Sequence, residues 1–215
     1  PRTVVALISS FPYAINWTQE NVPAIVHLSH NSQELGTGLA RVLFGDVDPG
    51  GRLVQTWPRS LEQLPPMLDY DLSKGRTYRY FEGEPLYPFG FGLSYARIEY
   101  ENASLLSKQL RLEQSVSVRV ELANLGARAG DEVIQIYARF PHSKIARPKR
   151  LLCGFRRVSL NPGERREIDV NVRGIDLAHW DEATHAFALE RGEVELVVAR
   201  SAADTRHTLK LMLNE

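Results

Sequence analysis

Two segments of the 215-residue sequence carry polar side chains in combinations that could bind a ligand. The first, His30-Asn-Ser-Gln-Glu34, places an imidazole, amides and a carboxylate side by side. It follows the apolar run Ala24-Ile-Val-His-Leu-Ser29, which is typical of a buried parallel strand. Ligands of open α/β sheets bind at the carboxyl ends of such strands, so the loop is a candidate rim for a sugar or other polyol. The candidate residues are His30, Asn31, Gln33 and Glu34.

The same loop has a purely structural alternative. Leu35, Leu39, Val42 and Leu43 follow at helical spacing and predict a helix over residues 33–44. Ser32 or Asn31 could cap that helix, and Glu34 in its first turn would be stabilised by the helix dipole. The local sequence favours this alternative, and both interpretations stand.

The second polar segment combines carboxylates, tyrosines and arginines. It runs through Asp69-Tyr-Asp71 and Gly75-Arg-Thr-Tyr-Arg-Tyr-Phe81. Carboxylates beside Tyr and Arg can hold hydroxyl-rich ligands through hydrogen bonds and ring stacking. The candidate residues here are Asp69, Tyr70 and Arg76. The same side chains could instead fasten an irregular segment onto two domains.

Most other signatures of chemistry are absent from the sequence. It has no Walker-type loop, no GxGxxG after the first strand and no GxSxG elbow, and nothing in it indicates a cofactor. His27 and His30 would point to opposite faces of a strand, which argues against a metal pair. Asp46-Val-Asp48 lacks the later residues of a calcium loop and predicts a turn that ends the helix. Cys153 lies in an apolar stretch, which favours a buried structural thiol over a nucleophile.

Composition narrows the class of protein further. Lys and Arg total 26, and Asp and Glu total 26, so the formal net charge is zero, which argues against a general nucleic-acid binder. No apolar run approaches the ~20 residues that a membrane-spanning helix needs. A single Cys excludes an intrachain disulfide framework.

Basic side chains gather locally between residues 139 and 157, with no Asp or Glu before Glu164. One interpretation is a patch that binds an anion or docks a domain. The other is a solvated loop and strand edge, where Lys and Pro discourage the addition of a further strand. The sparse aromatic residues favour the second interpretation.

The type of secondary structure that the sequence predicts changes near residue 97. Before it, Thr3–Ser9 and residues 24–29 predict strands buried on both faces of a parallel sheet. Gly45–Gly51 predicts the turn that ends the helix. Residues 52–96 are rich in proline and aromatic side chains and predict a long irregular segment held by aromatic packing. Since a buried strand this close to residue 1 needs covering neighbours, we expect further sequence upstream.

From Arg97 onward the hydrophobic period becomes two. Val116, Val118, Val120 and Leu122 alternate with polar residues, and similar runs recur near residues 134, 168, 194 and 209. Turn signals separate these runs, among them Pro162-Gly163, which fits the centre of a type II turn. Short alternating strands over about 115 residues predict an antiparallel β-sandwich. The predicted organisation is a partial α/β sandwich domain over residues 1–96 and a β-sandwich domain over residues 97–215.

Several long motifs give a family resemblance. Gly45-Asp-Val-Asp-Pro-Gly-Gly-Arg-Leu53, Trp57-Pro58 and Tyr87-Pro-Phe-Gly-Phe-Gly-Leu-Ser-Tyr95 resemble the carboxyl-terminal region of family 3 glycoside hydrolases, which are β-glucosidases, β-xylosidases and relatives. Ala129-Gly-Asp-Glu-Val-Ile-Gln-Ile-Tyr137 and Leu160-Asn-Pro-Gly-Glu164 resemble the fibronectin type III-like domain of that family. The motifs occur in order over almost the whole chain.

The resemblance implies an architecture and a reaction. Members begin with a TIM-like barrel, continue with an α/β sandwich domain and end with the fibronectin-like sandwich. They are retaining, exo-acting glycosidases that use a nucleophilic Asp and an acid/base Glu. The resemblance places both carboxyl groups upstream, so no catalytic residue is expected in this chain, and Glu34 is expected at the rim that faces the barrel.

Three hypotheses for the chain follow. It could be the inactive carboxyl-terminal part of a β-glucosidase or β-xylosidase, with the missing barrel as its partner and an oligosaccharide or glycoside as substrate. It could be a carbohydrate-binding module, for which Trp180 and Phe187 are the only stacking candidates outside residues 140–155, although both could belong to the core. It could be a structural spacer. No membrane partner is expected, and a periplasmic or extracellular location fits such enzymes better than a cytoplasmic one.

Overall fold

The first part of the chain forms a small parallel sheet with two helices. The computed structural model describes residues 2–214, so Pro1 and Glu215 lie outside it. Strand β1 pairs in parallel with β2, in the register Val4↔Ala24 to Ile8↔Leu28. Glycine 45, at φ 78°, turns the chain after the second helix, as predicted. These elements are β1 (Val4–Ile8), α1 (Asn16–Asn21), β2 (Ala24–Leu28) and α2 (Leu35–Leu43).

The prediction that these strands are buried on both faces is wrong for the described chain. Val4 is 47% exposed and Ile8 is 42% exposed, and β1 alternates between exposed and half-buried residues. The physical reason is that β1 and β2 pair only with each other, since their sheet has two strands. Part of the apolar surface of β1 and β2 therefore stays exposed in the described chain.

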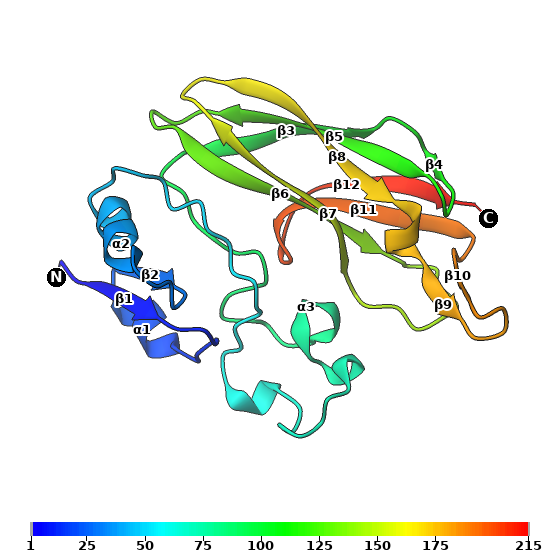
Figure 1. Cartoon of the computed structure of the whole chain (residues 1–215), viewed down its shortest axis with the longest axis horizontal. Coiled ribbons are helices and arrows are strands. Elements are labelled where there is room, and N and C mark those ends of the chain that lie inside the picture. The colour runs from blue at the N-terminus through cyan, green and yellow to red at the C-terminus, as the bar shows by residue number, and fades with distance from the viewer. Residues whose placement is uncertain (1, 215) are drawn as a thin grey trace.

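The second part of the chain is the predicted antiparallel β-sandwich. One sheet has five strands in the order β4-β12-β11-β6-β7, and the other has three in the order β3-β5-β8 (Figure 1). A separate hairpin joins β9 to β10. The strands are β3 (Ile98–Leu105), β4 (Gln109–Leu110), β5 (Ser115–Asn124), β6 (Gly130–Arg139), β7 (Leu151–Leu160), β8 (Arg165–Arg173), β9 (His179–Asp181), β10 (Ala186–Ala188), β11 (Gly192–Ser201) and β12 (Asp204–Leu213), with a short helix η3 (Gly174–Leu177) before β9.

The period-two pattern produces the sandwich core. Val118, Val120 and Leu122 of β5 have no exposed surface, and they face the inner side chains of the five-stranded sheet, such as Ile134 and Ile136. Burying a continuous layer of branched aliphatic side chains from both sheets supplies most of the stability of such a fold. The turn at Gly163, with φ 76° and a hydrogen bond from Glu164 N to Asn161 O, has the type II features expected.

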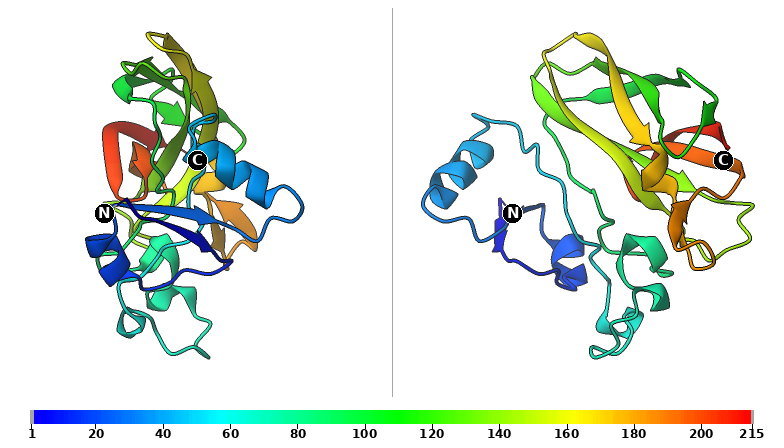
Figure 2. Two further views of the ribbon diagram at one scale, coloured as in Figure 1. Left: turned by 90° about the vertical axis from the view of Figure 1, so that its left-hand side faces the viewer. Right: turned by 45° about the vertical axis from the view of Figure 1, so that its right-hand side comes forward.

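A long irregular segment, residues 52–96, runs between the parallel sheet and the sandwich (Figure 2). Its only regular pieces are η1 (Leu61–Gln63), η2 (Leu72–Lys74) and α3 (Thr77–Tyr80). Tyr78 stacks on Phe89 at 4.4 Å and meets Tyr137 of β6 edge-on at 5.7 Å, centroid to centroid. These rings cover the outer face of the five-stranded sheet, where Tyr137 and Val197 are fully buried. The aromatic packing predicted for this segment is confirmed.

Trp57 connects the irregular segment to the parallel sheet. It is 2% exposed, and its ring meets the rings of His27 and Tyr87 edge-on at 5.1 and 5.8 Å. Its backbone pairs with Tyr87, donating a hydrogen bond to Tyr87 O and accepting one from Leu86 N. A single buried indole thereby fixes β2 and both ends of the irregular segment relative to one another.

One buried and one half-buried carboxylate also join the segments before residue 97 to the sandwich. Glu132 of β6 is 3% exposed and pairs with Arg52 at 2.8 Å and Arg200 at 3.2 Å. Asp48 accepts hydrogen bonds from the Ser94 hydroxyl and from the backbone N–H groups of Tyr95 and Asp131. Each carboxylate joins segments that are distant in the sequence.

The glycine at position 90 permits the closest approach in this connection. Its φ is 80°, and a Cβ there would lie 2.0 Å from Gln135 Oε1. Gln135 is itself buried and donates a hydrogen bond to Gly90 O at 3.1 Å. Only glycine satisfies both the left-handed backbone and this contact.

We expect Asp48→Ala to destabilise the protein by about 2 kcal/mol, because it leaves the N–H groups of Tyr95 and Asp131 without their acceptor. Urea unfolding of the chain measures the loss. Asp46→Ala is the matched control: Asp46 is exposed, its side chain has no hydrogen bond among residues 2–214, and we expect a change below about 0.5 kcal/mol. Equal losses in both variants would contradict the role of Asp48.

Candidate functional site

The first candidate loop lies at the carboxyl edge of the β1–β2 pair, as predicted. Ser9 and Ser10 follow β1, and Ser29 and His30 follow β2, so residues from both strand ends meet at one edge. Ser10 Oγ lies 2.7 Å from His30 Nδ1, and Ser9 Oγ lies 3.2 Å from His27 Nε2. The hydrogen bond with Ser10 uses Nδ1 of the exposed His30 imidazole, and Nε2 has no hydrogen-bond partner among residues 2–214.

The predicted capping of the following helix is wrong. Helix α2 begins at Leu35 with Glu34 at its N-cap position, and no side chain accepts a capping hydrogen bond. Neither Ser32 nor Asn31 serves as the cap, because the chain turns earlier, with Asn31 N donating to Ser29 O. The exposed side chains of Asn31, Gln33 and Glu34 are therefore not used to begin the helix.

The second candidate segment uses most of its polar groups internally. Arg76 donates from Nε to Asp69 O at 2.7 Å and from Nη2 to Pro66 O at 2.7 Å. Asp69 Oδ2 pairs with Lys74 Nζ at 2.8 Å. These bonds hold the segment together internally, and none among residues 2–214 joins the Asp69 or Arg76 side chain to the parallel sheet or the sandwich, so the alternative in which they fasten the segment onto two domains is wrong for these two residues. Tyr70 differs, because it is 81% exposed.

Asp71 also has a local role. It caps η2, and hydrogen bonds from the hydroxyl and the backbone N–H of Ser73 lower its pKa. Arginine and carboxylate groups in this segment thus hold a compact loop, from whose surface Met67, Leu68 and Tyr70 project. No hydrogen bond or ion pair within residues 2–214 joins this loop to the His30 loop, so the two candidate segments remain separate in the described chain.

Sequence reasoning missed Ser10, although its position after β1 could have indicated a partner for the residues that follow β2.

Trp180 and Phe187, the stacking candidates of the sandwich, lie on the β9–β10 hairpin with 52% and 54% of the two residues exposed. Their rings meet edge-on at 5.4 Å. The alternative that they belong to the core is wrong.

Other potential reactive groups are structural in the described chain. Cys153 is buried, with its sulfur 3.4 Å from Ile136 O, and burial raises the pKa of its thiol to about 12. Residues 2–214 contain no group of three His, Cys, Asp or Glu side chains placed to hold a metal ion. Across the same residues, every helix is too short or too polar to cross a bilayer.

Comparison with known protein families identifies both parts of the chain. Residues 1–95 match the model of the glycosyl hydrolase family 3 C-terminal domain, and residues 132–202 match that of the fibronectin type III-like domain. The resemblance read from the sequence motifs and the predicted fold class are therefore confirmed.

Individual relatives align with the whole chain. A β-glucosidase of Rhizobium radiobacter is 35% identical over 99% of the chain, and a β-xylosidase of Formosa agariphila is 34% identical over 97% of it. The chain covers only 28% and 29% of these relatives. Among solved structures, a β-D-glucoside glucohydrolase from Trichoderma reesei superposes with a TM-score of 0.90 and 30% identity, over 98% of this chain and 33% of that one.

We expect Cys153 to react with iodoacetamide at pH 8 at least about a hundredfold more slowly in the folded chain than in the denatured chain, because its raised pKa suppresses the thiolate. Since the folded pKa lies above the unfolded value, the thiol does not affect stability below about pH 8 but reduces it as the pH rises further. Mass spectrometry of the labelled protein measures the rate. Rapid labelling without unfolding would contradict the structural assignment of this thiol.

Proposed function

Since the chain belongs to glycoside hydrolase family 3 and corresponds to the carboxyl-terminal region of its members, we propose that it is part of an exo-acting retaining β-glycosidase. The whole enzyme would release terminal β-linked sugars from oligosaccharides or other glycosides as a β-glucosidase or β-xylosidase. Residues 1–96 would be the end of its α/β sandwich domain, and residues 97–215 its fibronectin type III-like domain.

The observation that carries this proposal is the match of nearly the whole chain to β-glycosidases of which it spans less than a third. A retaining mechanism needs a carboxylate that attacks the anomeric carbon and a second carboxyl group that protonates the leaving oxygen. We assign both groups to the upstream part of the whole protein. Glu34, the only Glu in the candidate loop, lies at the N-cap position of α2 and has no second carboxylate beside it in its five-residue loop.

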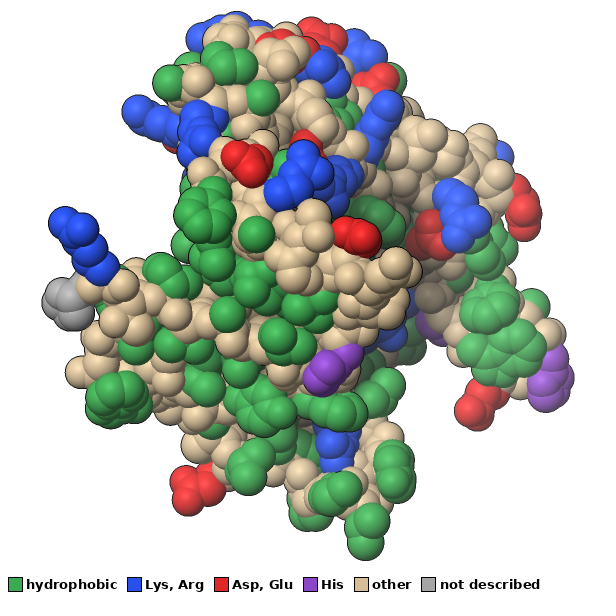
Figure 3. All heavy atoms as spheres, turned by 60° about the vertical axis from the view of Figure 1, so that its left-hand side comes forward, with side chains coloured by type: hydrophobic (Ala, Val, Ile, Leu, Met, Phe, Trp, Pro, Cys, Tyr) green, Lys and Arg blue, Asp and Glu red, His purple; other side chains and the backbone are tan. Residues whose placement is uncertain are grey.

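The distribution of apolar surface supports a partner domain next to residues 2–95. Hydrophobic side chains gather over the lower half of the face in Figure 3, whereas charged side chains gather over the sandwich above. Strongly exposed apolar side chains occur in the parallel-sheet part and in the irregular segment, among them Phe11 (70%), Trp17 (71%), Phe44 (85%), Met67 (87%) and Leu68 (81%). Exposed apolar surface of this extent is typical of an interaction site. We propose that the upstream barrel covers part of it.

Within that assembly we propose His30, Asn31, Gln33 and Glu34 as the polar rim of the substrate site. Their support is their position at the carboxyl edge of β1 and β2 and the absence of a capping role for the amides. Tyr70 would add an exposed ring from the second segment. Asp69 and Arg76 would act by holding that segment in shape rather than by contacting the sugar.

The assignment of both catalytic carboxyl groups to the upstream part of the protein predicts that the chain alone is inactive. We expect purified residues 1–215 to show no hydrolysis of aryl β-glucosides or β-xylosides, because the two catalytic carboxyl groups would be absent. The whole natural protein, obtained from its full coding region, is expected to hydrolyse at least one of them. Hydrolysis by the chain alone that a point mutation abolishes would overturn the assignment, and so would a whole protein that turns over neither substrate.

Kinetics of the whole protein also test whether His30 belongs to the proposed polar rim of the substrate site. We expect His30→Ala to raise KM about tenfold with little change in kcat, since it removes a hydrogen bond made to both ground and transition states. His142→Ala is the control, because His142 is exposed in the loop between β6 and β7 and has no hydrogen-bond partner among residues 2–214. Identical kinetics of the His30 variant and the control would remove His30 from the rim.

The exposed aromatic hairpin favours a second candidate function, a non-catalytic carbohydrate-binding module. Trp180 and Phe187 present half of their surface to solvent on β9 and β10, and exposed aromatic faces can stack on sugar rings. This role is compatible with a glycosidase, which would then hold a polysaccharide beside its active site. A purely structural sandwich is the remaining alternative.

Affinity electrophoresis in gels that contain β-glucan or xylan separates these two roles. A binding module is expected to be retarded, and Trp180→Ala to lose most of that retardation because it removes the stacking surface. Phe155→Ala is the matched control, since Phe155 is 67% exposed on β7, away from the hairpin. Unretarded migration of the unaltered chain in every gel would leave the structural role.

A further inference from the structure

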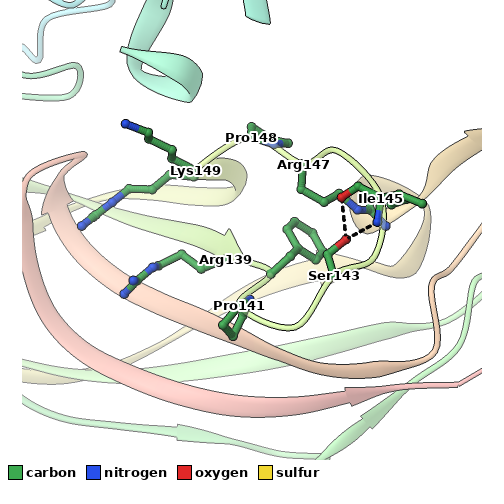
Figure 4. Close-up of a pocket in the computed structure, with 9 residues that line it drawn as sticks. Arg139, Pro141, Ser143, Ile145, Arg147, Pro148 and Lys149 are labelled. Atoms are coloured by element: carbon green, nitrogen blue, oxygen red, sulfur yellow. Dashed lines mark hydrogen bonds between the residues drawn. The ribbon is translucent and has the colours of Figure 1, made fainter. Parts of the chain in front are cut away.

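A surface cavity lies where the loop between β6 and β7 leaves the sheet. It has a volume of about 530 Å³, within the range of small-ligand sites. Figure 4 shows the Arg139 and Lys149 side chains extending to the same side of this loop, away from Ile145. The lining residues are Arg139, Phe140, Pro141, Ser143, Ile145, Arg147, Pro148, Lys149 and Arg150, of which four are cationic and none is acidic.

Two of the cations face each other across a strand pair. Ala138 and Leu151 are the last paired residues of β6 and β7, so Arg139 and Arg150 stand directly beyond them on opposite strands. Arg139 and Arg150 lie in sequence two residues from Tyr137 and Leu152, whose side chains belong to the cluster on the outer face of the sheet. Like charges in directly opposed positions repel each other and destabilise a sheet.

The cations of the cavity differ in how far their charge is neutralised. Arg147 is committed to the fold: its Nη1 atom donates to Leu177 O at 3.2 Å, and its guanidinium covers the Phe140 ring at 4.4 Å. Arg139 and Lys149 have carboxylate neighbours, Glu195 at 3.3 Å and Glu82 at 3.4 Å.

Arg150 has no such neighbour within residues 2–214. The one hydrogen bond recorded for its guanidinium goes to the Thr205 hydroxyl, at 3.4 Å. The pKa of this guanidinium is lowered, first by partial burial and then by the positive charge of Arg139. The protein thus holds a half-buried arginine, with no carboxylate of its own among residues 2–214, beside a second arginine that pairs with Glu195.

We propose that this cavity is an oxyanion-binding site, in which Arg150 and Arg139, with Lys149 above them, hold a carboxylate, sulfate or phosphate group. A guanidinium presents parallel N–H donors that match two oxygens of such a group, and an anion between the arginines relieves their repulsion. Phe140 and Pro141 give the cavity an apolar side against which the body of an acidic ligand, such as a uronic acid, can lie. This inference does not depend on the proposed hydrolytic activity.

NMR titration of the ¹⁵N-labelled chain tests the proposal. Sodium sulfate, sodium phosphate, sodium glucuronate and uncharged glucose are added separately, with sodium chloride holding the ionic strength constant. We expect saturable shifts confined to residues 139–150 with the oxyanions and none with glucose. Binding by glucuronate alone would identify a sugar carboxylate as the ligand, and binding by all three anions a general oxyanion site.

Variants distinguish a built site from general attraction to a cation-rich surface. We expect Arg150→Gln to weaken anion binding about tenfold, because a charge-assisted hydrogen bond is lost, and Lys149→Gln to weaken it less. Arg41→Gln is the control, since Arg41 is exposed on α2, outside the sandwich. Amide spectra of each variant establish that it folds.

Three results would overturn the proposal. The first is an absence of saturable shifts in residues 139–150 with any of the three oxyanions. The second is equal binding by the Arg150 and Arg41 variants, which would reduce the effect to general electrostatics. The third is a response to glucose as strong as the response to glucuronate, because the arginine pair would then have no part in recognition.

Discussion

The buried ion group of Glu132, Arg52 and Arg200 is the interaction on which the arrangement of the chain depends. Its three members come from β6, the start of the irregular segment and β11. A buried carboxylate is costly without partners, so Glu132, which already pairs with Arg200, is further stabilised when Arg52 lies against the sheet. Once Arg52 is fixed, the adjoining motif can place Asp48 against the N–H groups of Tyr95 and Asp131. The irregular segment then follows a defined path although it has little secondary structure.

This dependence explains what the conspicuous motifs of the sequence do. Asp48 of the first motif, Trp57, and Gly90 of the Tyr87–Tyr95 motif all lie at the junction between the parallel sheet, the irregular segment and the sandwich. Their residue types are required by hydrogen bonding, ring packing and close backbone approach. The motifs by which the chain resembles glycoside hydrolase family 3 are therefore structural at these positions.

The sandwich strands β5, β6, β8, β11 and β12 and the type II turn could be predicted from the sequence because each depends on a local pattern. Alternation of Val116 to Leu122 specifies a strand with one buried face, and Pro162-Gly163 specifies its turn. The burial of β1 could not be predicted in the same way, since it depends on which strands lie beside it. The start of α2 at Leu35 follows a backbone turn from Ser29 to Asn31 that the pattern of apolar residues does not specify. The hydrogen bonds of Arg76 to Pro66 O and Asp69 O, and the exposure of Tyr70, likewise depend on the path of the loop between them.

The packing of Tyr78 and Phe89 on the five-stranded sheet limits which part of the chain can move between proteins by recombination. Tyr137, Val197 and Ala199 form an apolar outer face, against which Tyr78 and Phe89 of the preceding irregular segment pack. A recombination event that transferred the β-strands alone would carry an uncovered sheet face into its new host, with the risk of aggregation that such a surface brings. The transferable evolutionary unit is therefore larger than the sandwich and includes the proline-rich segment before it.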